Sequence, residues 1–410
     1  MTTTPSTSTD RFAEAAVVEA ARGRGEPDWL VERRAEAARA FETLPMPSTL
    51  LRPWKYTDVS DLDLAAFPPV EPSVTIEASA PEGGSAVGTL LDAIAFDSDA
   101  LNAELGGLIP ATEGKFQALN AIEWRGGIAV HAAARGRFEA PVVVDLRVDE
   151  SAPASISPRV VINAEEQSEV TVVLRLESGA APLLVAGVIE VYAAQAATVR
   201  LLIDERWGAA TQDFTFIRTR LGRDADVQVA SLAIGGHLVK QTIEALVEGE
   251  GANSVIRGVA LGDADQHFDF VTLQDHIGPR TTSEVEIKAA LAGASRSIYY
   301  GVTRVEETAA GASADQANRN LLLSGHAKAD SDPVLEILTA NVIRCGHAAA
   351  VGPVDNEALF YLQSRGLDYR TSLQLLVTGF FQSAIGGIPL DGVSEQLAEV
   401  VQAKLATAAL

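Results

Sequence analysis

The pattern of apolar and polar positions divides the chain into a helical start, a long β region and a helical end. Residues 10–22 (DRFAEAAVVEAAR) and the segment after Pro27 (DWLVERRAEAARAFETL) are rich in Ala, Glu and Arg, which favour helix. We predict a disordered Ser/Thr-rich tail over 1–9, an N-terminal helical region over 10–65 and a mixed, loop-rich connection over 66–127.

From about 128 to 352 the pattern is that of β-strands. Apolar and polar positions alternate in segments such as DFTFIRTRL (213–221) and DVQVASLAI (226–234), and turn residues separate the runs. No amphipathic helices lie between the runs, which argues against a βαβ fold. A long, uninterrupted series of short strands is typical of a solenoid. We therefore predict a mainly β protein with a β-helix core over 128–352, and a large β-sandwich is the alternative.

Residues 353–410 are predicted to form a C-terminal helical domain. Its helices are expected to begin at Asp355 and end at Gly366, to span about 369–385, and to run from a cap at Ser394 towards Leu405.

The second of these helices carries two adjacent phenylalanines, Phe380 and Phe381, that cannot both point the same way. One can enter the domain's own core, while the other, together with Leu376, helps to form a docking surface. A partner protein is the expected occupant of such a surface.

Composition and charge narrow the classes of partner. The net charge of −23 and the pI near 4.6 argue against nucleic acid and against an anionic membrane surface. No run approaches the roughly 18 apolar residues of a membrane span. The N-terminal stretch MTTTPSTSTDRF has no basic segment followed by an apolar core, so we do not interpret it as a secretory signal. Together with a single cysteine, this predicts a cytoplasmic protein.

That single cysteine, Cys345, stands two residues before His347. On an extended strand the two side chains face the same side, where they could bind a soft metal or act as a nucleophile and base. The bland alternative is a buried cysteine beside a surface histidine. Two ligands are too few for a structural zinc site, and an iron–sulfur cluster normally needs about four. A cluster here would require a site shared with another subunit.

Three other groups of residues are predicted to be structural rather than functional. Trp54, Lys55 and Tyr56 are expected to anchor the N-terminal helices. His267 and His276 are expected to be structural or surface residues that could stack on neighbouring strands. Gln316, Asn318 and Asn320 are expected to form a hydrogen-bonded ladder.

The sequence contains no standard enzyme motif. A GxGxxG after a strand, a Walker loop, HExxH, GxSxG and CxxC are all missing. A cytoplasmic β-helix enzyme acting on a carbohydrate-like substrate is nevertheless the alternative to a binding protein, and a structural homo-oligomer is a third reading.

Several long segments, in order along the chain, resemble the SufB/SufD family of iron–sulfur cluster assembly proteins, and most closely SufD. The most specific are HFDFVTLQDHIGPRTTSEVEIKAAL, YYGVTRVEETAAGASADQANRNLLLSGHAKADSDPVLEI and VIRCGHAAAVGPVDNEALFYLQSRGL; shorter matches are EPDWLVERRAEAARAF and LRPWKYTDVSDLDL. The resemblance is concentrated in residues 267–380.

This resemblance implies a right-handed parallel β-helix flanked by helical regions. It also implies a non-catalytic scaffold that pairs with SufB through the β-helix ends and binds the ATPase SufC through the C-terminal helices. Whether the lone chain forms a homodimer when SufB is absent is left open by the sequence. Cys345 and His347 match the family's Cys-x-His pair, which implies that His347 lies where a nascent cluster, shared with SufB and not held by this chain alone, is formed.

The match has two departures and one discriminating feature. Gly346 and Ala348 replace the more usual Ser or Thr and Gly, which leaves the pair intact but changes its surroundings. SufB members carry several cysteines, and this chain has one. The cysteine count therefore favours SufD over SufB.

Overall fold

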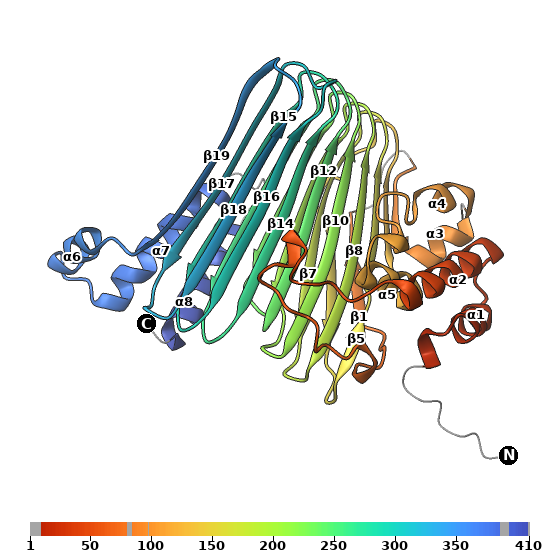
Figure 1. The fold of residues 1–410 in the computed structure, drawn as a ribbon, viewed down its shortest axis with the longest axis horizontal. Coiled ribbons are helices and arrows are strands. Elements are labelled where there is room, and N and C mark those ends of the chain that lie inside the picture. Colours follow the sequence, from red (N-terminus) through yellow and green to blue (C-terminus); the bar gives the residue numbers. More distant parts are fainter. Residues whose placement is uncertain (1–9, 80–83, 97, 386–392, 409–410) are drawn as a thin grey trace.

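Two long parallel β-sheets wind into a solenoid of about eight turns in the computed structural model (Figure 1). The structure describes residues 10–79, 84–96, 98–385 and 393–408; the predicted tail over 1–9 lies outside them. The predicted β-helix core is thus confirmed and the β-sandwich alternative is wrong. In the described part of the chain, no helix is long and apolar enough to cross a membrane.

From β6 onwards, strands alternate between the two sheets along the chain. The first sheet has the order β1-β4-β7-β9-β11-β13-β15-β17-β19, comprising Ser73–Glu77, Val142–Val148, Glu169–Ser178, Thr198–Arg206, Asp226–Ala233, Asn253–Gly262, Thr282–Leu291, Ala312–Leu322 and Val342–Pro353. The second has the order β18-β16-β14-β12-β10-β8-β6-β3-β2, comprising Lys328–Ile337, Arg296–Val305, His267–His276, Leu238–Val247, Thr211–Leu221, Leu183–Ala193, Arg159–Ala164, Ile128–Ala132 and Ala86–Thr89; β5 (Ala154–Ile156) also pairs with β8.

The interior of the solenoid is filled by stacked aliphatic side chains. Because parallel strands pair in register, residues that face inward on one coil lie above their partners on the next. Val144, Leu174 and Ile203 form one such stack across β4, β7 and β9, and all three are buried. This repetitive burial of small and medium side chains accounts for a stable core in a chain with 6% aromatic residues.

The tight turn that precedes β7, β9 and β11 has the same backbone conformation in successive coils but not the same sequence. The left-handed backbone position is taken by Gln167, Ala196 and Asp224 in successive coils, with φ values of 60°, 57° and 55°. Each coil's turn also donates a backbone hydrogen bond to the next, as from Gln167 N to the carbonyl of Gln195 (2.9 Å). Since the turn is held by its backbone, no fixed residue is needed, and no literal repeat motif is visible in the sequence.

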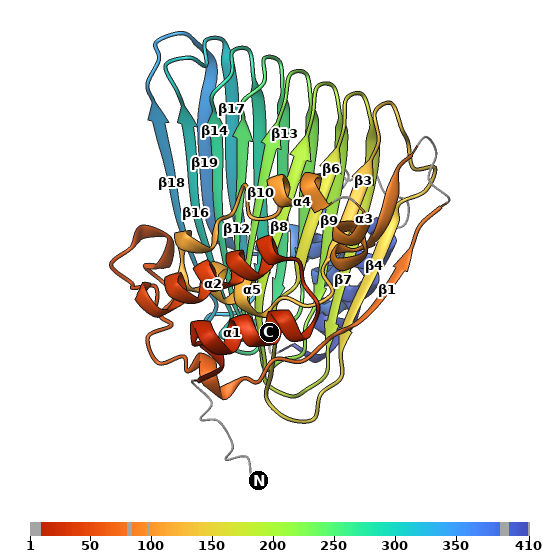
Figure 2. The same ribbon diagram turned by 90° about the vertical axis from the view of Figure 1, so that its right-hand side faces the viewer.

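The N-terminal region covers the outer face of the second sheet (Figure 2). Its helices are α1 (Glu14–Gly23), α2 (Asp28–Thr43), α3 (Leu90–Phe96), α4 (Ser98–Glu104) and α5 (Lys115–Glu123), with short 3-10 turns at Asp10–Phe12, Arg52–Trp54, Leu64–Ala66 and Ala111–Glu113. Trp54 stacks on Phe116 and Phe214 with ring centroids 5.7 and 6.0 Å away, which confirms its predicted role as a packing anchor.

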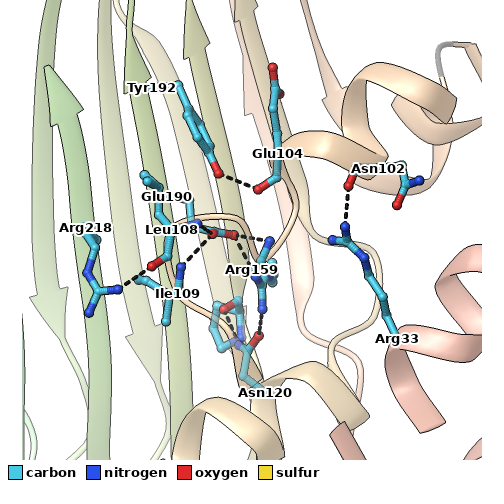
Figure 3. Close-up of polar contacts among 12 residues, drawn as sticks. Arg33, Asn102, Glu104, Leu108, Ile109, Asn120, Arg159, Glu190, Tyr192 and Arg218 are labelled. Carbon is cyan, nitrogen blue, oxygen red and sulfur yellow. Dashed lines mark hydrogen bonds and ion pairs between the residues drawn. The ribbon is translucent and has the colours of Figure 1, made fainter. Parts of the chain in front are cut away.

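A buried carboxylate fixes the segment after α4 to the solenoid (Figure 3). Glu190 on β8 is fully buried and accepts hydrogen bonds from the backbone N–H groups of Gly106, Leu108 and Ile109 at 2.8 to 3.0 Å. It also pairs with Arg159 at 2.6 Å. Four donors compensate for its removal from water.

The C-terminal helices cover the outer face of the first sheet. They are α6 (Asn356–Ser364), α7 (Tyr369–Ile385) and α8 (Val393–Thr407), close to the predicted boundaries. As predicted, the Asp355 side chain caps α6 and Gly366 follows it with a φ of +94°. Gly386, Gly387 and Pro389, which are expected from the sequence to end the helix over 369–385, and the side chain of Ser394 lie outside the described residues. Helices α7 and α8 bury apolar residues against the sheet, whereas α6 projects away from it (Figure 1).

Candidate functional site at the open end of the solenoid

The two ends of the solenoid differ. At the N-terminal end, β1 and β2 are the last strands; they run antiparallel to β4 and β3 and, in the described chain, also pair on one side only. At the other end, β18 and β19 are the last strands, and in the described part of the chain each pairs with a neighbour on one side only. Large apolar side chains are exposed there: Ile337, Leu338, Ile343 and Val351. The C-terminal end of the solenoid is therefore open and has two free strand edges.

Cys345 and His347 lie on the inner face of this last coil. Cys345 pairs in register with Ala314, and His347 with Gln316, on β17. Both partners are buried, so the two side chains continue inward-facing stacks. The prediction that the pair shares one face is confirmed. With no further coil above it in the described chain, His347 is exposed even though it faces inward.

The environment of Cys345 favours its protonated form. It is half-buried against Val342 and the cluster of Val305, Ala309 and Ala312. Burial, with a smaller contribution from the charge of Asp315, raises the pKa of the thiol. A thiol with a raised pKa is a weak nucleophile at neutral pH. Of the two predicted site residues, His347 is thus the better placed to act as a ligand.

Gly346, between them, faces the outer side and lies close to a carboxylate of the neighbouring strand. A Cβ at this position would lie 2.8 Å from Oδ1 of Asp315. The same oxygen pairs with Arg344 at 2.9 Å. A serine would displace this carboxylate, so the departure from the family pattern at 346 matches a local ion pair and leaves the inward-facing pair in place.

Beneath the site lies a row of three buried amides. The amide of Gln316 donates to the carbonyl of Val334 (3.0 Å), that of Asn318 to the carbonyl of Ile287 (3.2 Å), and that of Asn320 to Oδ1 of Asn318 (2.6 Å). They are hydrogen-bonded, as predicted, but they do not form a ladder. The residues beside Gln316 on the neighbouring coils are Val285 and His347, so the amides run along one strand only.

Deeper in the solenoid a second polar group surrounds His276, which sequence reasoning assigned only a structural role. His276 is fully buried, with Nε2 2.6 Å from the hydroxyl of Ser283 and Nδ1 2.8 Å from that of Thr281. Burial lowers the pKa of His276 to about 4, so the imidazole is neutral. His267 lies at the other end of the same strand. The two histidines therefore lie at opposite ends of one strand and do not stack on neighbouring strands, an arrangement that the sequence left open.

The described residues contain no group of three or more His, Cys, Asp or Glu side chains placed to hold a metal ion. At the open end this chain offers one imidazole and one thiol. The arrangement can supply part of a ligand set to a facing subunit, and a proton carrier at the junction.

The predicted docking residues on α7 differ in exposure. Phe381 is fully buried in the cluster under α7, while Phe380 and Leu376 are half-buried. Lys288 lies over the ring of Phe380 at 4.8 Å. The exposed apolar side chains of these helices lie elsewhere: Phe360 and Tyr361 on α6, and Tyr369 and Leu375 on α7.

The sequence also matches a known family. Residues 146–380, from within β4 to within α7, match the family model described as "SUF system FeS cluster assembly, SufBD core domain". The chain belongs to the SufB/SufD family. The matched region contains the whole open end and the Cys345–His347 pair.

Individual relatives carry names from the same system. An iron-sulfur cluster assembly SufBD family protein of Mycobacterium bovis is 33% identical over 206 residues, which is 48% of this chain and 52% of the relative. The iron-sulfur cluster assembly proteins SufD and SufB of Bacillus subtilis are 29% and 26% identical, over 72% and 69% of this chain and 68% and 61% of their own lengths. The match thus spans about half the length of the mycobacterial relative.

Proposed function

We propose that this chain is a SufD-type, non-catalytic scaffold subunit of a cytoplasmic SUF complex, which pairs end to end with a SufB-like paralogue. The observation that carries the proposal is the position of His347 and Cys345 on the inner face of an uncovered terminal coil. A second solenoid facing this coil would enclose the pair. A nascent cluster, the product that the complex must release, would then form between the two subunits.

The ligand arithmetic supports a shared site. One imidazole and one thiol are at most two of the roughly four ligands that a cluster takes. The remaining ligands must come from the partner, because no third His, Cys, Asp or Glu joins the pair in the described chain. The single cysteine also assigns this chain to the SufD side, since a SufB-type subunit supplies several thiols.

The free edges of β18 and β19 provide the means of association. Unpaired backbone N–H and C=O groups along an edge strand form hydrogen bonds with another strand. The exposed Ile343 and Val351 add apolar area beside that edge. In the absence of the paralogue, a second copy of this chain would present the same edges, which would allow a homodimer of the lone chain.

The SufC-like ATPase is assigned to the C-terminal helices. Because Phe381 is part of the core, the docking surface would be formed by the partly exposed Phe380 and Leu376 and by the more exposed Phe360 and Tyr361 of α6. Helix α6 buries none of its own residues, as befits an element whose apolar side chains are covered by a partner.

Affinity purification of the native protein, with mass-spectrometric identification of the associated chains, tests the whole proposal. A SufB-type paralogue and an ABC-type ATPase are expected in near-equal abundance to the bait. Recovery of the chain alone or only with itself, from cells that express the paralogue, would contradict it. Such a result would favour the structural homo-oligomer.

A further inference from the structure

A cavity of about 320 Å³ lies between α2, the segment after α4 and the second sheet. Its walls are mixed, and Leu30, Leu105, Ile109 and Trp124 are among the apolar residues. Three arginines, Arg33, Arg34 and Arg159, also line it, and Arg34 is paired with Glu26 at 2.6 Å. Apolar residues together with a few polar groups, around a volume of this order, are usual for a small-molecule site.

Arg159 has more donors than partners. It is 3% exposed, and its two terminal nitrogens reach Oδ1 of Asn120 (3.0 Å) and Oε2 of Glu190 (2.6 Å). Its Nε is buried and has no partner. Glu190 compensates the positive charge of Arg159 only in part, because the same carboxylate also accepts hydrogen bonds from the backbone N–H groups of the 106–109 segment.

Arg33 approaches the same space from α2 (Figure 3). It is half-buried and donates to the backbone carbonyl of Asn102. Burial and the charge of Arg159 lower its pKa, as expected of a cation with too little negative charge around it. The acidic residue that lines the cavity, Glu36, is exposed to solvent.

The two guanidinium groups meet beside Gly106. A Cβ placed on this glycine would lie 3.5 Å from Nη2 of Arg159 and 3.7 Å from Nη1 of Arg33. The missing side chain leaves a space that both cations border. Arg33 is half-buried and donates to the carbonyl of Asn102, whereas Nε of Arg159 is a buried donor without an acceptor in the described structure. Buried donors without acceptors are unfavourable, and an anion relieves this.

We propose that this cavity binds a small organic anion. A carboxylate or phosphate oxygen of the ligand lies beside Gly106 between Arg33 and Arg159, and its apolar portion packs against Leu30 and Trp124. The volume equals that of about ten water molecules at ~30 Å³ each, which limits the ligand to a small metabolite and excludes a dinucleotide. The cavity lies in the N-terminal region, at the opposite end from β19 (Figure 1), so the proposal is independent of the SUF assignment.

Isothermal titration of the full chain with hexanoate, inorganic phosphate and hexanamide tests this proposal. Hexanoate provides charge and an apolar body, phosphate charge alone, and hexanamide the same body without charge. We expect saturable binding of hexanoate, weaker binding of phosphate and none of hexanamide. Arg33→Gln should weaken hexanoate binding about tenfold or more, and Thr112→Glu, which adds a negative charge to an exposed lining residue, should do the same.

Arg39→Gln is the matched control. Arg39 is exposed on the same helix and pairs with Glu14 and Glu32, so its loss should leave binding unchanged. Thermal unfolding establishes that each variant is folded. The proposal is overturned if hexanoate does not bind at millimolar concentration, which would mean that the cavity holds water only. Equal binding of hexanamide, binding of phosphate but not hexanoate, or unchanged affinity in both Arg33→Gln and Thr112→Glu would also overturn it.

Discussion

His347 lies directly beyond Gln316 in the inner stack of the first sheet, as its register partner across β17 and β19. Gln316 is 2% exposed and is held by Tyr299, whose hydroxyl donates to it at 2.9 Å. His347 has the same inward orientation but is exposed. The imidazole therefore lies above a side chain that a hydrogen bond holds in place, and it faces any subunit that covers the open end.

Replacing the imidazole should separate cluster formation from assembly. We expect His347→Ala to leave the fold and the subunit composition of the complex unchanged, because the side chain is exposed. Iron and sulfide in the anaerobically isolated complex should fall about tenfold or more, since loss of a ligand exceeds the usual effect of disturbing a metal site's surroundings. Cys345→Ser should have a smaller effect, since its thiol is half-buried and protonated. A fully loaded His347→Ala complex would refute the assignment of this residue.

Charges on the rim of the open end should weaken subunit pairing. Ile343 and Val351 are 77% and 46% exposed on β19. An Ile343→Asp/Val351→Asp variant places two carboxylates beside the free edge, and its dissociation constant from the paralogue should rise about tenfold or more in analytical ultracentrifugation. Val74→Asp is the control, because Val74 is 42% exposed on β1 at the opposite end. Equal effects of the two variants would argue against pairing through β19.

The ATPase assignment can be tested without removing a domain. Deleting 355–410 would uncover the apolar outer face of the first sheet, which α7 and α8 bury. A Phe360→Asp/Tyr361→Asp variant instead changes two exposed residues of α6, a helix with none buried. It should abolish co-purification of the ATPase while leaving thermal unfolding and paralogue binding unchanged. Retention of the ATPase by this variant would exclude α6 from the docking surface.

A buried pair of acids predicts how stability varies with pH. Glu205 and Asp213 are fully buried, and burial raises the pKa of both, that of Asp213 to about 6. A carboxyl group with a higher pKa in the folded state binds its proton more tightly there, so stability is present at low pH and is lost as pH rises towards 6. In the Glu205→Gln variant, the side-chain amide can donate a hydrogen bond to Asp213 without titrating. The substitution should raise the free energy of unfolding at pH 8 by on the order of 1 to 3 kcal/mol and flatten its pH dependence between 4 and 6.

The measurement is urea unfolding of both proteins across this pH range. Glu177→Gln is the control, because Glu177 is half-exposed on β7 and pairs with Arg147 at the surface. Its stability should follow that of the unaltered chain. A Glu205→Gln variant that is less stable at pH 8 would show that the negative charge of Glu205 is retained in the folded state.

The class of fold could be predicted from local sequence patterns. The prediction fails where long-range contacts decide the structure. The strand β12 (Leu238–Val247) was not predicted, because Lys240, Gln241 and Glu244 interrupt its apolar pattern. Lys240 is nevertheless 2% exposed, as it pairs with Asp269 at 2.6 Å and lies over the ring of Trp54 at 4.7 Å. Both partners come from distant parts of the sequence, which periodicity within one segment cannot reveal.

Only part of the candidate site could be predicted from the sequence. That Cys345 and His347 share a face follows from their spacing on a strand. That this face is the inside of an uncovered coil depends on the order of the strands in both sheets. The closeness of position 346 to a carboxylate likewise depends on Asp315 of the neighbouring strand.

The central claim is that the free edges of β18 and β19 form the junction with the paralogue. Hydrogen–deuterium exchange of the backbone amides in 328–337 and 342–353, with and without the purified SufB-type subunit, tests it most directly. The account predicts fast exchange of the edge-facing amides in the lone chain, measured at a concentration at which it is monomeric, and strong protection in the complex, with 73–77 at the other end unchanged. Unaltered exchange in both strands, in a complex shown by mass to be assembled, would contradict it.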